Sequence, residues 1–181
     1  DPLEHNNLWT FLSNLLLIHS LGIGQGASWN EPSWSISVEF YTYIVFFVYV
    51  FLLGGRLRFV TSLVASLAAY GCLYWLADST LIKAHDLGML RCLGGFFMGV
   101  FVYDLFSVTR QNLSVLMLSL LEVAAVSLSV ILILASPGSK LVELFAFISF
   151  GLVVYVFAIQ ADGVVSKLLC LKPFVFVGKL S

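Results

Sequence analysis

Charged residues are scarce in this sequence. Asp, Glu, Lys and Arg make up 10% of its 181 residues, whereas a soluble domain carries about 25%. The net charge is −1, and the nine Lys and Arg residues form no basic patch, which argues against a nucleic-acid partner. Hydrophobic residues make up 60% of the chain and its mean hydropathy is +1.02. The composition therefore predicts an integral membrane protein.

Motifs of soluble enzymes and metal sites are also missing. The sequence has no Gly-rich phosphate loop, no G-x-S-x-G and no H-E-x-x-H, which argues against the chemistry that each motif supports. The three cysteines, Cys72, Cys92 and Cys170, show no C-x-x-C spacing, and two of them lie in apolar runs. We therefore expect packing residues rather than disulfides or metal ligands, and no metal cofactor.

Six apolar runs approach or reach the roughly 20 residues that a membrane-spanning helix needs. Backbone exposed to lipid must satisfy its own hydrogen bonds, so each run is predicted to be a helix. The fold class is thus an all-α membrane bundle with about six transmembrane helices. The first run is short and contains Asn14 and His19, which suggests a tilted or internally buried helix. The runs are Leu8–Ile23, Trp34–Leu53, Phe59–Ala77, Leu87–Phe106, Leu113–Ala135 and Leu141–Gln160.

Lysine and arginine are distributed unequally between the loops. With strict alternation of the runs, one side receives six of the nine basic residues, including Arg56 and Arg110, and the other receives two. The ninth, Arg91, lies inside the fourth run. The positive-inside rule then places Arg56 and Arg110 in the cytoplasm and Trp29–Ser35 at the outer face.

Glu39 is the most conspicuous residue of the second run. Apart from tyrosines it is the only ionisable side chain between Trp34 and Leu53, and it lies about 7 Å into the predicted helix. A charge at that depth is costly without a partner or a function. Ser35, Glu39 and Tyr43 are spaced i, i+4, i+8, so they share one helix face. This pattern indicates a polar face in an apolar helix.

Helix capping does not account for Glu39. Ser33 or Asn30 can cap the helix, with Pro32 near its first turn. A capping box needs Glu three residues after Ser, however, and Glu39 is four residues after Ser35.

Three further polar residues allow alternative interpretations. Arg91 lies at a predicted depth similar to that of Glu39, so the two form an ion pair or line one cavity, unless Arg91 extends alone to the interface. Glu122 stands in mid-helix and must face the bundle interior, face a cavity or be protonated. His19 is either a proton carrier or an internally hydrogen-bonded residue.

The fourth run also contains a glycine packing pattern. Gly95-x-x-x-Gly99 is a pattern that allows close helix approach.

Three ordered segments carry a resemblance to a known family. They are Asn14-Leu15-Leu16-Leu17-Ile18-His19-Ser20-Leu21, then Asn30-x-Pro32-Ser33-Trp34-Ser35-Ile36-Ser37-Val38-Glu39-Phe40-Tyr41, then Arg91-Cys92-Leu93-Gly94-Gly95-Phe96-Phe97-Met98-Gly99. The second resembles the W-S-L-S-x-E-x-x-x-Y type segment of the acyltransferase 3 family, membrane enzymes that O-acylate polysaccharides and related acceptors. The other two resemble the neighbouring helices of that family. After Gly99 the similarity rests on hydropathy, up to Pro173–Ser181.

The chain also departs from the family pattern. Family members carry an arginine followed some ten residues later by a histidine thought to be essential, and an arginine-rich segment thought to help hold acyl-CoA. Neither is present here. We therefore expect residues 1–181 to be an interior fragment of the membrane domain that is inactive alone.

The resemblance implies a function and a set of site residues. The expected activity is transfer of an acyl group, most simply acetyl from acetyl-CoA, to a carbohydrate hydroxyl of a cell-envelope or exported glycan, in the bacterial inner (plasma) membrane. The missing histidine would be the base. The catalytic candidates are Glu39, Ser35, Ser37 and Arg91, and the substrate-binding candidates are Trp34, Asn30, Tyr43 and His19.

Two other functions are compatible with the sequence. Intramembrane Glu39, Arg91 and Glu122 could line the path of a transporter or flippase of lipid-linked sugars. A non-catalytic packing module would use the same charges only to hold helices together. Neither the acceptor nor the oligomeric state follows from the sequence.

Overall fold

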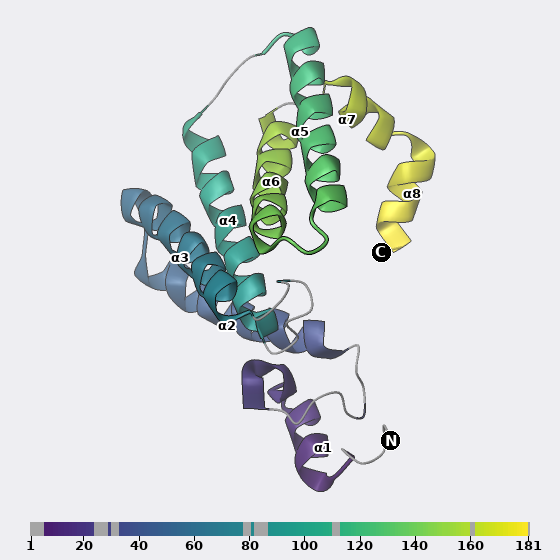
Figure 1. The fold of residues 1–181 in the computed structure, drawn as a ribbon. Coiled ribbons are helices and arrows are strands. Elements are labelled where there is room, and N and C mark those ends of the chain that lie inside the picture. Colours follow the sequence, from purple (N-terminus) through teal and green to yellow (C-terminus); the bar gives the residue numbers. More distant parts are fainter. Residues whose placement is uncertain are drawn as a thin grey trace. The chain divides into compact units, whose positions relative to one another are not determined.

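The structure is a computed structural model that describes residues 6–23, 29, 33–77, 81, 87–109, 113–159 and 162–180. Within these ranges the regular elements are all helical and no strand occurs, so the predicted all-α class is confirmed (Figure 1). The elements are α1 (Leu8–Leu15), the π-helical turn η1 (His19–Ile23), α2 (Trp34–Leu52), α3 (Gly55–Leu76), α4 (Gly88–Val108), α5 (Val115–Ala135), α6 (Lys140–Ile159), α7 (Val164–Leu169) and α8 (Lys172–Leu180).

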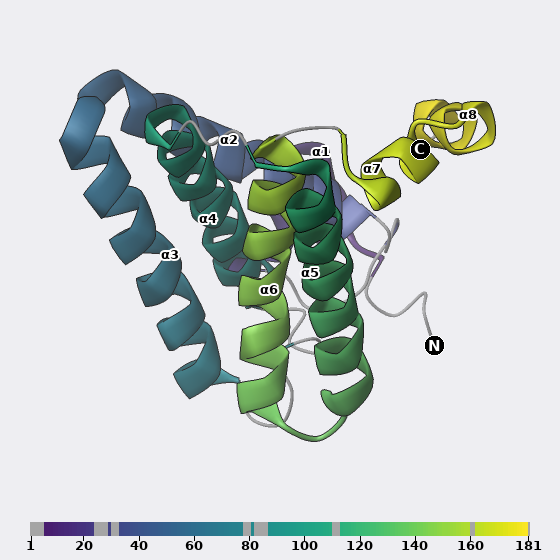
Figure 2. The same ribbon diagram turned by 90° about the horizontal axis from the view of Figure 1, so that it is seen from above.

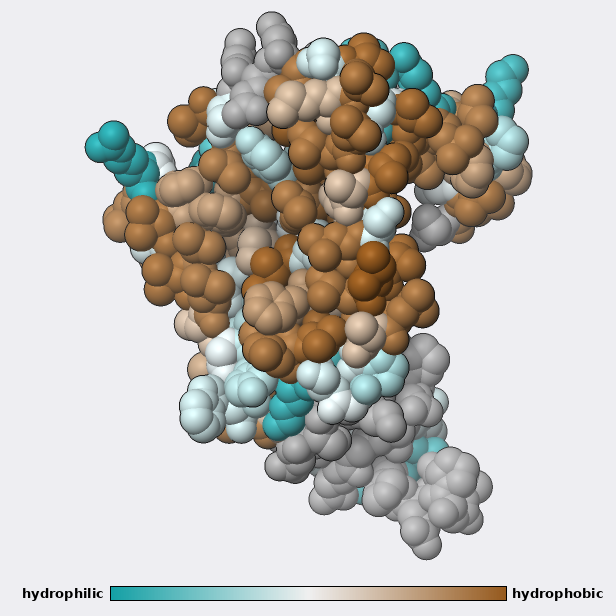
Figure 3. Space-filling view, turned by 45° about the horizontal axis from the view of Figure 1, so that its top comes forward, coloured by the Kyte–Doolittle hydropathy of each residue, from teal (hydrophilic) through white to brown (hydrophobic). Residues whose placement is uncertain are grey.

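Among the residues that the structure describes, five helices, α2 to α6, are long and apolar enough to cross a membrane. They contain 19 to 22 residues each, which matches the thickness of the hydrocarbon core. Only 17 to 28% of the residues in their apolar stretches are buried inside the protein, and apolar side chains dominate the face drawn in Figure 3. Helices that are apolar on their outward faces need lipid around them. The chain is therefore a multi-pass membrane protein.

The first predicted span is wrong. The run Leu8–Ile23 does not form one helix, because α1 ends at Leu15 and Leu17 adopts a left-handed backbone with φ of +56°. The break frees the carbonyls of Leu16 and Leu17. These accept hydrogen bonds from Tyr41 Oη at 3.2 Å and from the Ser37 hydroxyl. The bonds from α2 replace those that a continuous helix would have made.

The chain divides into two compact units, Asp1–Met98 and Gly99–Ser181, with the division inside α4. In the first unit, α3 packs on the beginning of α4. Ser66 Oγ donates to the carbonyl of Gly94 at 2.8 Å, and a Cβ on Gly94 would lie 2.9 Å from the Tyr70 ring. The absence of a side chain at Gly94 is what admits Tyr70. A Cβ on Gly95 would lie 3.5 Å from Tyr70 Oη, and a Cβ on Gly99 would meet no atom of the described residues within 4 Å.

In the second unit, α5 and α6 form a helical hairpin. They lie side by side in two perpendicular views (Figures 1 and 2). The turn between them contains Gly138 at φ +85°, a conformation that glycine adopts without strain. Helix α7 then packs against α5 through Glu122, as described below.

Candidate functional site

One face of α2 holds the segment α1–η1. Ser33, Ser37 and Tyr41 follow each other at i, i+4, i+8, and all three reach that segment. Ser33 Oγ contacts Asn14 and His19, while the Ser37 hydroxyl and Tyr41 Oη donate to the carbonyls of Leu17 and Leu16. Ser33 is the residue before α2 but makes no side-chain capping bond. Its hydroxyl serves the polar cluster instead.

A second face of α2 packs on α4. Trp34, Val38 and Thr42 are again spaced by four residues. A Cβ on Gly88 would lie 3.4 Å from Trp34 and 3.6 Å from Val38, and Thr42 Oγ1 donates to Cys92 Sγ at 3.3 Å. Small residues on α4 thus allow a close approach along this face.

The third face carries the predicted polar set Ser35, Glu39 and Tyr43. They do share a face of α2, about 160° around the helix from the face that holds His19. Glu39 is exposed, and it makes no hydrogen bond or ion pair with any residue that the structure describes. Ser35 is half-buried, and the exposed Tyr43 ring packs edge-on against Phe96 with centroids 5.8 Å apart. Glu39 is therefore the member of this set without a hydrogen-bond or ionic partner among the described residues.

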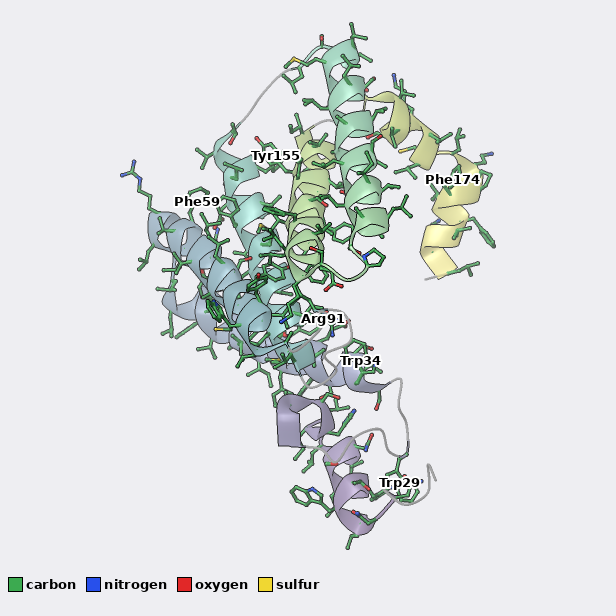
Figure 4. The ribbon with its side chains drawn as sticks, viewed as in Figure 1. Trp29, Trp34, Phe59, Arg91, Tyr155 and Phe174 are labelled. Atoms are coloured by element: carbon green, nitrogen blue, oxygen red, sulfur yellow. The ribbon has the colours of Figure 1, made fainter. Side chains whose placement is uncertain are left out.

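Arg91 does not pair with Glu39. Its guanidinium carbon lies 5.7 Å from the centroid of the Trp34 ring, and Nη1 donates to the carbonyl of Leu81 at 3.3 Å. Figure 4 labels Arg91 on α4 and Trp34 at the start of α2. Trp34 and Glu39 project about 140° apart on the helix, so an arginine stacked on Trp34 faces away from the carboxylate. The stacking is a cation–π contact. It differs from both predictions for Arg91, which were a pair or shared cavity with Glu39 and an extension alone to the interface.

His19 lies in a polar cluster formed by residues of α1, η1 and the beginning of α2. Its Nε2 is 3.0 Å from Ser33 Oγ, and Ser33 Oγ donates to Asn14 Oδ1 at 3.4 Å. Asn14 Nδ2 donates in turn to the carbonyl of Thr10 at 2.8 Å. Trp29 Nε1 donates to Thr10 Oγ1 at 3.1 Å. His19 Nδ1 is buried and has no hydrogen-bond partner within the described ranges.

This polar cluster is the centre of the candidate site, and the sequence predicted only some of its residues. His19 and Ser37 were predicted as site residues, whereas the contributions of Ser33 and Asn14 were not recognised. The sequence did contain a pattern that could have identified Ser33. Ser33, Ser37 and Tyr41 are spaced i, i+4, i+8, as are Ser35, Glu39 and Tyr43, so they also share one helix face. The predicted Asn30 lies outside the described residues.

Glu122 has a separate structural role. It is fully buried in α5, and its carboxylate accepts hydrogen bonds from the backbone N–H groups of Val165 at 2.9 Å and Ser166 at 3.2 Å, and from the Ser166 hydroxyl. Gly163 lies so close that a Cβ there would overlap the carboxylate. Glu122 therefore faces the protein interior and caps the beginning of α7, where the helix dipole favours negative charge.

The described residues contain no group of three or more His, Cys, Asp or Glu side chains that could hold a metal ion. Cys72, Cys92 and Cys170 are free thiols. Comparison of the chain with protein-family models, curated proteins and solved structures finds no match.

Proposed function

We propose that this chain is part of a membrane acyltransferase that moves an acyl group, most simply acetyl from acetyl-CoA, to a carbohydrate hydroxyl of a cell-envelope or exported glycan. The observation that carries the proposal is the contact of His19 Nε2 with Ser33 Oγ at 3.0 Å. It joins the two neighbouring segments that resemble the acyltransferase 3 family, because His19 lies in the first of them and Ser33 in the second.

The reaction needs a proton acceptor. The hydroxyl oxygen attacks the thioester carbonyl, an ester C–O bond forms, the C–S bond breaks, and the CoA thiolate leaves. The hydroxyl proton passes to a base and finally to the thiolate. Histidine is the side chain that most often fills this role, and His19 is the histidine that the described residues contain. The resemblance assigns that role to a histidine that this chain lacks, so we assign His19 to binding and positioning the acceptor hydroxyl.

Glu39 supports the same proposal in a different way. An ionisable group within a membrane helix is costly and is retained mainly for function. Because Glu39 makes no hydrogen bond or ion pair with the described residues, no fold contact within them accounts for it. Its face lies about 160° around α2 from the face that holds His19, so we assign it to binding a remote part of an extended polysaccharide acceptor.

The transporter alternative is weaker in this light. It requires intramembrane charges that line a path, but Glu122 caps α7 and Arg91 lies against Trp34 and the Leu81 carbonyl. Two of the three charges are thus engaged in contacts within the protein, which argues against a transport path lined by all three.

The test is incorporation of radiolabelled acetyl from acetyl-CoA into envelope polysaccharide. Membranes that contain the protein carrying this chain are compared with matched membranes that lack it. We expect label in the polysaccharide only with the protein, and release of that label by mild base, as for an O-acetyl ester. Labelling at the level of the control membranes would contradict the proposal and lead to assays of lipid-linked sugar transport.

A further inference from the structure

Helix α8 is exposed along its whole length. Each of its nine residues is exposed, and most of them are apolar. Phe174, Phe176, Val177 and Leu180 expose between 48 and 72% of their surface, and Figure 4 labels Phe174 on this helix. Apolar side chains gathered in this way mark a surface that meets a membrane or another protein. A partner other than the described residues must therefore cover α8.

The beginning of α7 lies beside α5 at a definite depth. The N–H groups of Val164 and Val165 donate to Ser119 Oγ at 3.2 Å and to the Glu122 carboxylate at 2.9 Å. Ser119 and Glu122 follow Val115, the first residue of α5, by about 6 and 10 Å along the helix axis. The whole of α5 is about 31 Å long, close to the thickness of the hydrocarbon core. Helix α7 thus begins about 6–10 Å below the end of this span, and amphipathic helices in the membrane interface are buried about 5–10 Å.

The start of α7 is also built for a place without water. The N–H groups of residues 164–166 precede the first hydrogen bond within the helix, which Lys167 donates to the carbonyl of Gly163. Ser119 and Glu122 accept from all three of these groups. Solvent satisfies such groups at a water-exposed helix end, whereas lipid cannot. The two side chains of α5 therefore supply what the surrounding lipid lacks.

The lysines of α8 give this helix a charged side and an apolar side. Lys172 and Lys179 are seven residues apart and project within about 20° of each other. Phe174 and Val177 project about 140–160° away from both lysines. Lysine on one face and large apolar residues on the opposite face are typical of a helix that lies in the plane of the membrane interface.

The charge of the segment indicates which lipid it contacts. Residues 163–180 contain Lys167, Lys172 and Lys179 and no acidic residue. Helices α5 and α6 form a hairpin, so the segment follows α6 back to the side on which α5 begins. Arg110, which precedes α5 in the sequence, led to the prediction that this side is cytoplasmic. The cytoplasmic leaflet carries anionic lipids, which attract basic segments beside a membrane span.

We propose that the α7–α8 segment, residues 164–180, lies in the membrane interface and that Lys167, Lys172 and Lys179 bind the phosphates of anionic phospholipids. Ser119 and Glu122 fix the start of the segment at the boundary of the hydrocarbon core. The apolar side of α8 then enters the acyl chains, and the lysine side chains extend to the headgroups. Lipid binding by this segment is independent of acyl transfer.

Spin labels at four consecutive positions of α8 test the orientation of the helix. A cysteine-free form of the protein that carries this chain is labelled at one cysteine and reconstituted in vesicles of phosphatidylcholine and phosphatidylglycerol. Collisions with oxygen and with a nickel complex give the depth of each label. The labels on the apolar side should lie about 5–10 Å below the phosphates, and the two between them, which project about 40–60° from the lysines, should be shallower. The variants are Phe174→Cys and Val177→Cys for the apolar side, and Val175→Cys and Phe176→Cys for the positions between.

Leu128→Cys is the reference for these depths, because Leu128 is exposed in the middle of α5. Its label should be deeper than the four labels of α8. A depth that increases steadily from residue 174 to residue 177 would show a helix that enters the core, and would overturn the proposal. Labels that the nickel complex reaches freely, or that neither reagent reaches, would also overturn it, because water or a protein such as a second copy would then cover α8.

Replacement of the lysines tests the headgroups. Each lysine near an anionic surface strengthens binding about fivefold, so three contribute about 10²-fold. With Lys167→Gln, Lys172→Gln and Lys179→Gln combined, the ratio of lipid-buried to water-exposed label at Val177→Cys should fall by that factor in the mixed vesicles. The matching triple arginine variant should keep the ratio, and phosphatidylcholine alone should give equal ratios for all three proteins. Equal ratios for the lysine and glutamine forms in the mixed vesicles would overturn the assignment to anionic headgroups.

Discussion

The hydroxyl of Ser37 donates a hydrogen bond to the carbonyl of Leu17, a residue in the left-handed backbone region. This contact satisfies a carbonyl released where α1 stops. It also binds the segment that carries His19 to α2. The interruption of the first apolar run and the position of the candidate site thus share a cause.

Ser37→Ala should destabilise the protein. Ser37 is fully buried, and its loss leaves the Leu17 carbonyl without that donor, a change that costs about 1–3 kcal/mol. Equilibrium unfolding in detergent measures the effect. Ser62→Ala, which removes an equally buried hydroxyl bonded to its own helix, should cost less. Equal losses in the two variants would show that the Ser37–Leu17 bond has no special role.

Gly94→Ala and Gly99→Ala should have opposite effects on stability. A Cβ on Gly94 would lie 2.9 Å from the Tyr70 ring, and such overpacking costs about 1–3 kcal/mol. Gly99 lies in the same helix with open space among the described residues, so alanine there should stabilise by up to about 1 kcal/mol. Thermal unfolding compares the two variants. A Gly94→Ala protein as stable as Gly99→Ala would contradict the observed α3–α4 packing.

Glu122→Leu should loosen α7 first. The substitution removes the acceptor of the Val165 and Ser166 N–H groups, and losing a helix cap costs about 0.5–2 kcal/mol. Hydrogen exchange of residues 163–170 should accelerate. Glu122→Gln keeps one oxygen acceptor and should show a smaller change. If exchange in this segment were the same in wild type and Glu122→Leu, the capping role would be wrong.

Glu39→Gln should fold normally and lower transfer. Glu39 is exposed and has no ionic or hydrogen-bond partner among the described residues, so its charge contributes nothing to their packing. Loss of a hydrogen bond between its carboxylate and the acceptor should cost about 1.5–3 kcal/mol, or about 10- to 100-fold in rate. Membrane level and acetyl transfer are measured together. A reduced amount of folded protein with unchanged specific activity would indicate a structural role instead.

The length of the apolar runs was sufficient to predict the five long helices of the described residues, α2 to α6. The runs beginning at Trp34 and Leu113 end within a residue of where α2 and α5 end. The break after Leu15 could not be predicted in this way. No glycine or proline marks it, and the groups that stabilise it, Ser37 and Tyr41, lie on another helix.

The site was predictable to the extent that local spacing determines it. The i, i+4, i+8 rule placed Ser35, Glu39 and Tyr43 on one face, but the neighbours of each face depend on tertiary packing. The same limit applies to Arg91, whose contact is Trp34, and to Glu122, whose partners lie 43 and 44 residues further along the chain. Sequence spacing cannot identify partners at such separations.

The most direct measurement is acetyl transfer by His19→Gln. Wild type, His19→Gln and the matched variant His85→Gln are compared at equal membrane levels, with labelled acetyl-CoA as donor and envelope polysaccharide as acceptor. If His19 positions the acceptor hydroxyl through a hydrogen bond worth about 0.5–1.5 kcal/mol, His19→Gln should lose about 2- to 10-fold in rate while His85→Gln labels like wild type. Equal labelling by His19→Gln and wild type would contradict the proposed site.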